Sequence, residues 1–139
     1  METGNHMATI DITMDTLNET IENNDIVLID FWAEWCGPCR SFAPTYEKVS
    51  EKYADSDLKI AFAKVDTEAE QQLAANFGIR SIPTLVAFRD QIGIFSQPGA
   101  LPGEALEDLI SQIEGLDMDA IREEIASEQA AAEEPAPAK

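Results

Sequence analysis

The feature that most constrains the fold of this chain is the segment FWAEWCGPCR, which begins at Phe31 and holds both cysteines of the sequence. Cys36 and Cys39 are separated by a Gly-Pro dipeptide, which is typical of a turn or a helix start. The residues before them, DIVLIDFWA at 25–33, are apolar on both faces, as in a central strand covered by helices. We therefore predict that the two thiols lie at a strand-to-helix junction.

Three structural interpretations of this cysteine pair are weak. A structural zinc site needs about four ligands, and the sequence offers two cysteines and the single histidine His6, so no metal site is expected. A structural disulfide would close a very short loop and remove little chain entropy. Free cysteines are often buried in cores, but a Gly-Pro turn is rarely deep in one. Redox cycling is the remaining interpretation.

The local physics of the junction favours redox cycling. At a helix N-terminus, unpaired N–H groups and the helix dipole favour an anion, so Cys36 is predicted to be an exposed, reactive thiolate. Cys39 lies three residues further on and therefore on the same helix face, where its sulfur can close a disulfide with Cys36. Pro38 is tolerated in the first turn because the first helical N–H groups have no partner.

The rest of the chain alternates between strand and helix patterns. A capping box formed by Thr67 and Glu70 predicts the start of the helix that ends near Gly78. Such alternation predicts a mixed sheet covered by helices on both faces. The expected strands are 8–13, 25–33, 58–66, 84–90 and 92–97, the last two forming a hairpin, and the expected helices are 14–24, 37–54, 67–78 and 102–115.

The ends of the chain have a different character from this single domain, which we place at residues 7–115. Residues 1–6 resemble a vector-derived remnant before Met7. Residues 116–139 form an acidic tail, predicted to contain a short helix around Ile121 and Ile125 and then to be disordered. Such a tail either increases solubility or provides a helix that binds a partner or docks on the chain itself.

The charge and the hydropathy of the chain exclude several classes of function. A net charge of −18 argues against nucleic acid or an anionic membrane surface as partner. No run approaches the roughly 18 apolar residues of a membrane span. The start METGNHM has neither the basic region nor the apolar core of a secretion signal. We therefore expect a cytoplasmic protein, in a compartment where thiols stay reduced unless they cycle.

Three motifs together give the sequence a family resemblance. FWAEWCGPCR, followed by SIPT at 81–84 and PGA at 98–100, resembles the thioredoxin family, and the likeness covers roughly Thr9 to Glu114. The resemblance implies a thioredoxin fold, in which four helices flank a central mixed five-stranded sheet. It implies a monomeric protein-disulfide reductase that cycles Cys36 and Cys39 between dithiol and disulfide. No bound cofactor is implied, and the expected partners are proteins with reducible disulfides and an NADPH-dependent flavin enzyme, thioredoxin reductase.

Asp30 and Lys64 are predicted to support the cysteines. Asp30 lies inside the apolar strand, where burial penalises the charged carboxylate and raises its pKa. The alternative is an edge residue whose side chain reaches water. The resemblance assigns Asp30 the role of proton acceptor and donor for Cys39, and it places Lys64 close to this acid, where its charge would partly offset the rise in pKa. Alternatively, Lys64 extends to solvent from a strand edge.

The resemblance also implies a substrate-binding rim. Pro83 matches the cis-proline of the family, which would leave the backbone of Ile82 free to pair with an extended substrate segment. Ser81 and Pro98 depart from the residues usual in the family and lie at this presumed groove, which bears on the choice of partner. The alternative for the rim is scattered surface hydrophobes. The residues expected to contact substrate are Trp35, Gly37, Pro38, Ile82, Pro83, Gly99 and Ala100.

Two rival functions remain open at the level of sequence. A disulfide oxidant or isomerase would use the same chemistry, but the Gly-Pro dipeptide between the cysteines and the lack of an export signal count against it. A non-catalytic module would use the apolar rim around the CGPC loop only to bind another protein. Replacing Cys36 by serine distinguishes the reductase from the binding module, because it should abolish turnover by a reductase and leave the binding of a module intact.

Overall fold

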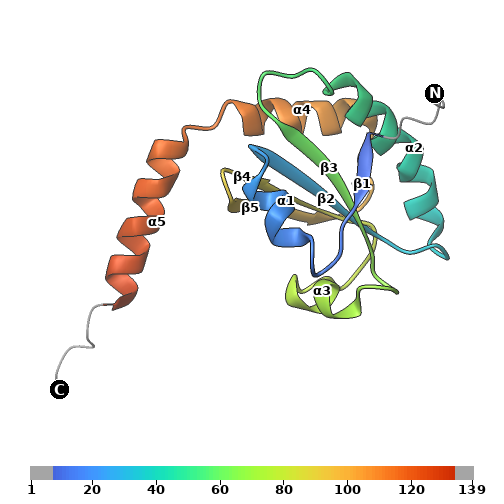
Figure 1. Cartoon of the computed structure of the whole chain (residues 1–139), viewed down its shortest axis with the longest axis horizontal. Coiled ribbons are helices and arrows are strands. Elements are labelled where there is room, and N and C mark those ends of the chain that lie inside the picture. The colour runs from blue at the N-terminus through green and yellow to red at the C-terminus, as the bar shows by residue number, and fades with distance from the viewer. Residues whose placement is uncertain (1–7, 134–139) are drawn as a thin grey trace.

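The computed structural model describes residues 8–133 and contains five strands and five helices within that range (Figure 1). The predicted order of elements is confirmed, with one more helix at the end of the chain. The remnant proposed for residues 1–6, with His6, and the disorder predicted for 134–139 fall outside the described residues. The elements are β1 Thr9–Asp11, α1 Leu17–Glu22, β2 Ile26–Trp32, α2 Gly37–Lys52, β3 Ile60–Asp66, α3 Gln71–Asn76, β4 Thr84–Arg89, β5 Ile92–Pro98, α4 Gly103–Glu114 and α5 Met118–Glu133.

A single mixed sheet organises the molecule, with strand order β1-β3-β2-β4-β5. β1, β3 and β2 are parallel, whereas β4 and β5 are antiparallel to their neighbours. β2 is the central strand, and six of its seven residues are buried. This explains the two-sided apolar pattern of the sequence, because helices cover both faces of the strand.

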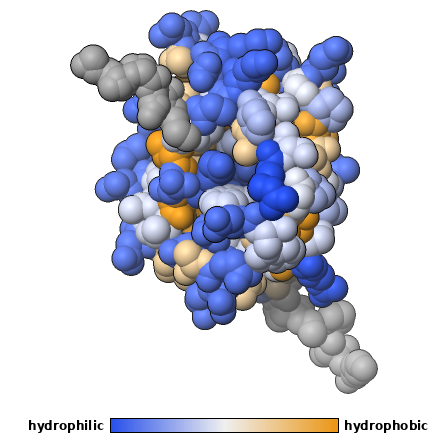
Figure 2. All heavy atoms as spheres, turned by 90° about the vertical axis from the view of Figure 1, so that its right-hand side faces the viewer, coloured by the Kyte–Doolittle hydropathy of each residue, from blue (hydrophilic) through white to orange (hydrophobic). Residues whose placement is uncertain are grey.

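Helices cover the sheet on both faces and create two apolar clusters. On one face, Leu28 and Phe62 pack with residues of α2 and α4, including Tyr46 and Ile110. On the other face, residues of β2 and β3 pack against α1 and α3, with Leu73 fully enclosed. Figure 2 shows that the side of the molecule at the right of Figure 1 is mainly hydrophilic, with apolar residues only in small patches. The core therefore lies inside the three layers.

The loop before α3 differs from the prediction of a capping box. The Thr67 hydroxyl donates to the Trp32 carbonyl oxygen at 3.0 Å. Glu70 is the N-cap of α3, but its side chain makes no capping bond to the helix within the described residues and accepts instead from the N–H of Met14 at 3.1 Å. Asp66 instead accepts a hydrogen bond from the N–H of Glu68 at 2.9 Å. The capping box is wrong because the Thr67 hydroxyl is used to join the ends of two parallel strands, and the helix begins only at Gln71.

The hairpin predicted between β4 and β5 is confirmed. Its two linking residues, Asp90 and Gln91, have φ angles of 50° and 71°. Positive φ at both central residues is the geometry that matches the twist of two tightly connected antiparallel strands. The hairpin matters for the C-terminus as well, because Asp90 forms an ion pair with Arg122 at 3.3 Å.

α5 is longer than the short helix expected in the acidic tail and makes the fifth helix where four were expected. It runs for 16 residues and projects away from the sheet (Figure 1). Its first turn is held by Met118, which is buried, and by Arg122, which bridges Asp90 and Asp119. The rest of α5 is rich in alanine and glutamate, which are strong helix formers. Among residues 8–133, no helix has both the length and the apolar character needed to cross a bilayer.

Candidate active site

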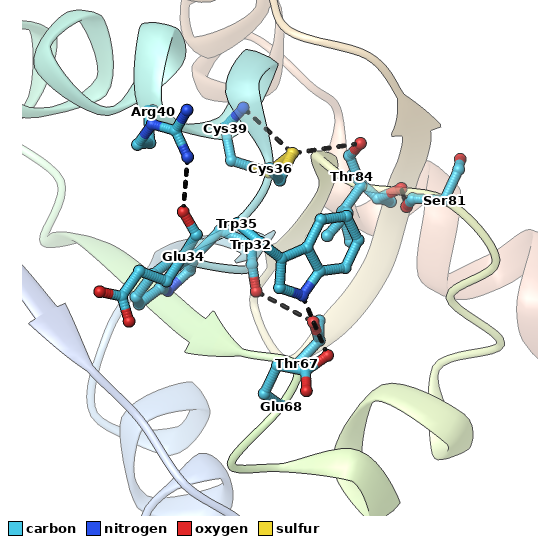
Figure 3. The surroundings of a disulfide bond; sticks show 11 residues. Trp32, Glu34, Trp35, Cys36, Cys39, Arg40, Thr67, Glu68, Ser81 and Thr84 are labelled. Atoms are coloured by element: carbon cyan, nitrogen blue, oxygen red, sulfur yellow. Dashed lines mark hydrogen bonds between the residues drawn. A yellow bond between two sulfur atoms is a disulfide. The ribbon is translucent and has the colours of Figure 1, made fainter.

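The two cysteines lie at the N-terminus of α2, as the sequence predicts. Cys36 is the N-cap residue, in an extended conformation, and Pro38 occupies the first turn. The backbone N–H of Cys39 donates to Cys36 Sγ at 3.2 Å (Figure 3). The Cα atoms of Cys36 and Cys39 are 5.2 Å apart and their sulfurs form a disulfide. The free N–H groups of a helix start therefore face the first sulfur, where they stabilise negative charge.

Cys36 is less exposed than predicted. Its exposed fraction is 4% and that of Cys39 is 2%, so the expectation of an exposed first sulfur is wrong for the disulfide form. The reason is packing against Trp32 and Ile82, combined with the bond to Cys39 itself. Trp35, just before Cys36, is exposed, as are the two residues after it. The sulfur therefore lies directly beneath the surface and not in the core.

A second segment, distant in the sequence, lies beside the disulfide. The Ile82–Pro83 peptide bond is cis, in agreement with the family resemblance. The carbonyl oxygen of Ile82 lies 3.7 Å from Cys36 Sγ. The N–H of Gly99 donates to the Pro83 carbonyl oxygen at 2.8 Å, and Gly99 has a φ of 106°, a value that favours glycine. The structure thus brings Ile82 beside Cys36 and ties Gly99 to Pro83, while Gly37, Pro38, Gly99 and Ala100 lie exposed.

Trp35 is the most exposed large apolar side chain near the cysteines, at 66%. Figure 3 shows its indole beside Cys36 with the ring nitrogen directed at Glu68, to which it donates at 3.2 Å. Sequence reasoning missed Glu68, because this hydrogen bond joins residues 33 positions apart and no local sequence pattern indicates it. Glu68 fixes the orientation of the Trp35 ring.

A hollow of about 340 Å³ lies next to Trp35 and Ile82. Arg80 and Ser81 contribute polar side chains to it, and Thr67, Ala74 and Ile79 complete its lining. Sequence reasoning did not single out Arg80. The one sign available was that Arg80 comes directly before the SIPT motif. The hollow lies beside the disulfide, because Ile82, which contacts Cys36, is part of its lining.

Asp30 is buried in β2 with an exposed fraction of 1%. Neither carboxylate oxygen has a hydrogen-bond partner among residues 8–133. Burial penalises the charged form and raises the pKa of Asp30 to about 7, while the positive charge of Lys64 acts in the opposite direction. The alternative of an edge residue that reaches water is wrong, because β2 is the central strand.

Lys64 lies directly opposite Asp30 in the register of β2 and β3. Its Nζ atom is 5.0 Å from the centre of the Trp32 ring, a cation–π distance. Lys64 also lines a hollow of about 220 Å³ with the acidic residues Asp11, Asp66 and Glu70. The lysine is half-buried, so its charge reaches both the buried acid and this polar hollow.

Cys36 and Cys39 can exchange a disulfide with another pair of thiols at this site. Within the described part of the chain, no three His, Cys, Asp or Glu side chains are grouped so that they could hold a metal ion. The site consists of a sulfur pair at a helix start, a buried acid with a pKa near neutrality, and a bordering cis-proline segment.

Comparison with known proteins gives consistent matches. Residues 8–112 match the family model described as Thioredoxin. The chain is 53% identical to "Putative thioredoxin 2" of Streptomyces coelicolor over 125 residues, 90% of each chain, and 37% identical to a thioredoxin of Porphyra purpurea over 76% of this chain and 97% of that one. A mutant thioredoxin from Halobacterium salinarum has a similar structure, with a TM-score of 0.71, 34% identity, and coverage of 83% of this chain and 98% of that one.

The match to the Streptomyces protein extends beyond the family core. The alignment with the Streptomyces protein covers 125 residues of this chain. Residues 1–112 can supply at most 112 of them, so at least 13 come from later in this chain. The match therefore reaches residue 125 or beyond, which lies inside α5. The Porphyra match spans 107 residues, about the length of the core alone.

Proposed function

Because this chain belongs to the thioredoxin family and is a thiol–disulfide oxidoreductase, we propose that it works as a reductase of protein disulfides. The observation that carries this proposal is the Cys36–Cys39 pair at the start of α2, bordered by the Ile82–Pro83 segment. A helix start favours the thiolate, and the thiolate is the nucleophilic form of cysteine.

The proposed reaction has two displacement steps. The thiolate of reduced Cys36 attacks one sulfur of a substrate disulfide, forms a mixed disulfide and releases the other substrate sulfur as a thiolate. The thiolate of Cys39 then attacks Cys36 Sγ, forms the Cys36–Cys39 disulfide and releases the second substrate sulfur. Two electrons pass to the substrate, its two thiolates take up protons, and the protein is left oxidised.

Asp30 is proposed to handle the proton of Cys39. Ionised Asp30 accepts the Cys39 proton before the second displacement and later returns it to a newly formed thiolate. A pKa of about 7 suits this task, because the group holds or releases a proton near neutral pH. Lys64 is proposed to keep the pKa of Asp30 in this range by opposing the effect of burial.

Substrate binding is proposed to use the rim around the disulfide. The backbone of Ile82 would pair with an extended substrate segment, while Trp35 offers an apolar platform held by Glu68. The remaining proposed contacts are with Gly37, Pro38, Pro83, Gly99 and Ala100.

The setting of the reaction is also part of the proposal. An NADPH-dependent flavin enzyme, thioredoxin reductase, would return the oxidised protein to the dithiol, with no cofactor bound to the chain itself. We further propose that the chain is a cytoplasmic monomer. The catalytic domain would span residues 7–115, and the acidic segment would follow at 116–139.

Reduction of insulin, coupled through a bacterial thioredoxin reductase to NADPH, tests the direction of the reaction. We expect the chain to make NADPH oxidation depend on insulin, and we expect its cysteine pair to be more reducing than glutathione when the two are equilibrated. A pair more oxidising than glutathione would identify an oxidant or isomerase instead. Insulin binding without NADPH oxidation would identify a non-catalytic module.

A further inference from the structure

An apolar groove runs along the edge of the molecule, outside the proposed active site. It consists of two adjoining hollows, of about 290 and 330 Å³, which share Phe95, Leu109 and Gln112. One wall is β5, which is the edge strand of the sheet, and the other wall is α4. The apolar side chains of this edge groove include Ile94, Phe95, Leu101, Leu109, Leu116 and Ile121.

The edge groove links the C-terminal helix with the proposed substrate rim. At one end, Ile121 of α5 forms part of the lining. At the other end is Leu101, two residues after Gly99, whose N–H is bonded to the Pro83 carbonyl oxygen. A segment lying in the groove would therefore have one end near the disulfide and the other end on α5.

The charge around the edge groove defines what can occupy it. Residues 103–133 contain ten acidic residues and one base, Arg122. Arg122 is already paired with Asp90 and Asp119, and Glu107 is paired with Lys52, so within the described part of the chain most of these acids have no ion-pair partner. A second copy of the chain would bring the same negative charge and be repelled, whereas a basic segment would be attracted.

α5 has the pattern of a binding helix more than that of a solubilising tail. Ile121 and Ile125 are four residues apart and therefore on one face, where both are half-buried. The exposed acids Glu124 and Glu128 flank this face, and Glu123 adds a third negative charge to the same turns of the helix. The match to the Streptomyces protein extends into this helix, so the segment is shared with a relative. An apolar stripe bordered by charge is the pattern that recognises an amphipathic helix of opposite charge.

We propose that the edge groove and the first turns of α5 bind a basic, amphipathic helical segment of a protein partner. Apolar side chains of that segment would fill the groove, and its Lys or Arg side chains would meet the acids of α4 and α5. That the partner also carries the disulfide reduced at Cys36 rests on the proposed function. The docked segment would then raise the local concentration of the disulfide near Cys36.

A disulfide-free probe tests the binding step alone. The probe is a synthetic 18-residue amphipathic peptide with leucines on one face and lysines on the other, titrated into the oxidised full chain by calorimetry. We expect specific binding that weakens as salt is raised, because exposed charges are screened. Two variants should each lower the affinity for the peptide at least about fivefold, because single interface contacts commonly contribute this much. One is Ile121→Ser. The other is the triple change Glu123→Gln, Glu124→Gln and Glu128→Gln.

A charge-matched control separates this site from general attraction to an acidic protein. The control changes the exposed residues Glu19, Glu22 and Glu51 to glutamine, which alters the net charge equally but lies on α1 and α2. We expect the control to bind like the parent chain, and all variants to keep insulin reduction and a normal circular dichroism spectrum. Equal loss of binding in the control and in the α5 variant would overturn the proposal.

Two further outcomes are decisive. Concentration-dependent dimerisation that Ile121→Ser abolishes would show that a second copy occupies the groove and would overturn the proposal. If the parent chain binds the peptide but does not reduce insulin, the proposed function is refuted and the docking site is still supported. A peptide disulfide joined to the basic helix should have a KM about tenfold below that of the same disulfide joined to an acidic helix, as expected for a raised effective concentration.

Discussion

Cys36→Ser is expected to lower insulin reduction by at least about 10³-fold, the scale seen when a covalent nucleophile is removed. The hydroxyl is not ionised at neutral pH and cannot form a disulfide, so no mixed disulfide is formed. The fold should be unaffected, because serine and cysteine are similar in size and serine is a good N-cap residue for α2. The measurement is the rate of NADPH oxidation in the coupled assay.

Cys39→Ser is the matched variant, and it should fail in a different way. Cys36 can still attack the substrate, but no second sulfur resolves the mixed disulfide. We expect a stable covalent complex, visible by mass spectrometry as the combined mass of the chain and its substrate, which dithiothreitol separates. A trapped complex with Cys36→Ser and none with Cys39→Ser would reverse the assigned order of the two sulfurs.

Asp30→Asn is expected to raise the free energy of unfolding at alkaline pH by about 4 kcal/mol. This figure is the difference of roughly three units between the folded and unfolded pKa of Asp30, at about 1.4 kcal/mol per unit. The pKa of Asp30 is 3.8 in the unfolded chain and about 7 in the folded protein. Between these values the unfolded state has released its proton while the folded state keeps it. The free energy of unfolding therefore falls as pH rises from about 4 to about 7, and then levels off.

The asparagine variant has no such titration, so its stability should exceed that of the parent chain increasingly as pH rises through this window. At pH 4 the two should differ by less than about 1 kcal/mol, because the folded carboxyl is still protonated and little more than half of the unfolded carboxyls are ionised. Denaturant titrations of the oxidised proteins at pH 4, 6 and 8 measure the difference, and the exposed Asp15→Asn serves as control. A difference that does not change with pH would mean that Asp30 is not a buried, protonatable carboxyl.

The same substitution also bears on the proposed mechanism. Without the carboxylate, Cys39 loses its proton acceptor, and we expect resolution of the mixed disulfide to slow at neutral pH. The formation of the mixed disulfide by Cys36 should change much less. A rapid-quench measurement of the two steps separates this effect from the effect on stability.

The parts of the fold encoded by local patterns could be predicted from the sequence. β2 is recognisable because it is buried on both faces, and this also placed Asp30 in the interior. The junction at Cys36 is recognisable because a Gly-Pro dipeptide follows an apolar strand. The cis bond at Pro83 came from the family resemblance, since most X-Pro bonds are trans.

The features that escaped prediction depend on contacts between distant residues. The Trp35–Glu68 hydrogen bond joins two loops, and the low exposure of Cys36 depends on Ile82 from a third. Thr67 had the spacing of a cap, but a strand-end carbonyl oxygen competed successfully for its hydroxyl. The length of α5 was underestimated because its composition resembles that of a disordered tail, whereas its first turn is held in place by Arg122 and Asp90.

The central claim is that Cys36, at the start of α2, is the attacking sulfur. The most direct test is to reduce the protein, add less than one equivalent of iodoacetamide at pH 7, and locate the modification by peptide mass spectrometry. We expect Cys36 to be alkylated at least about tenfold faster than Cys39, because the helix start favours its thiolate. Equal modification of both cysteines, or faster modification of Cys39, would contradict the account.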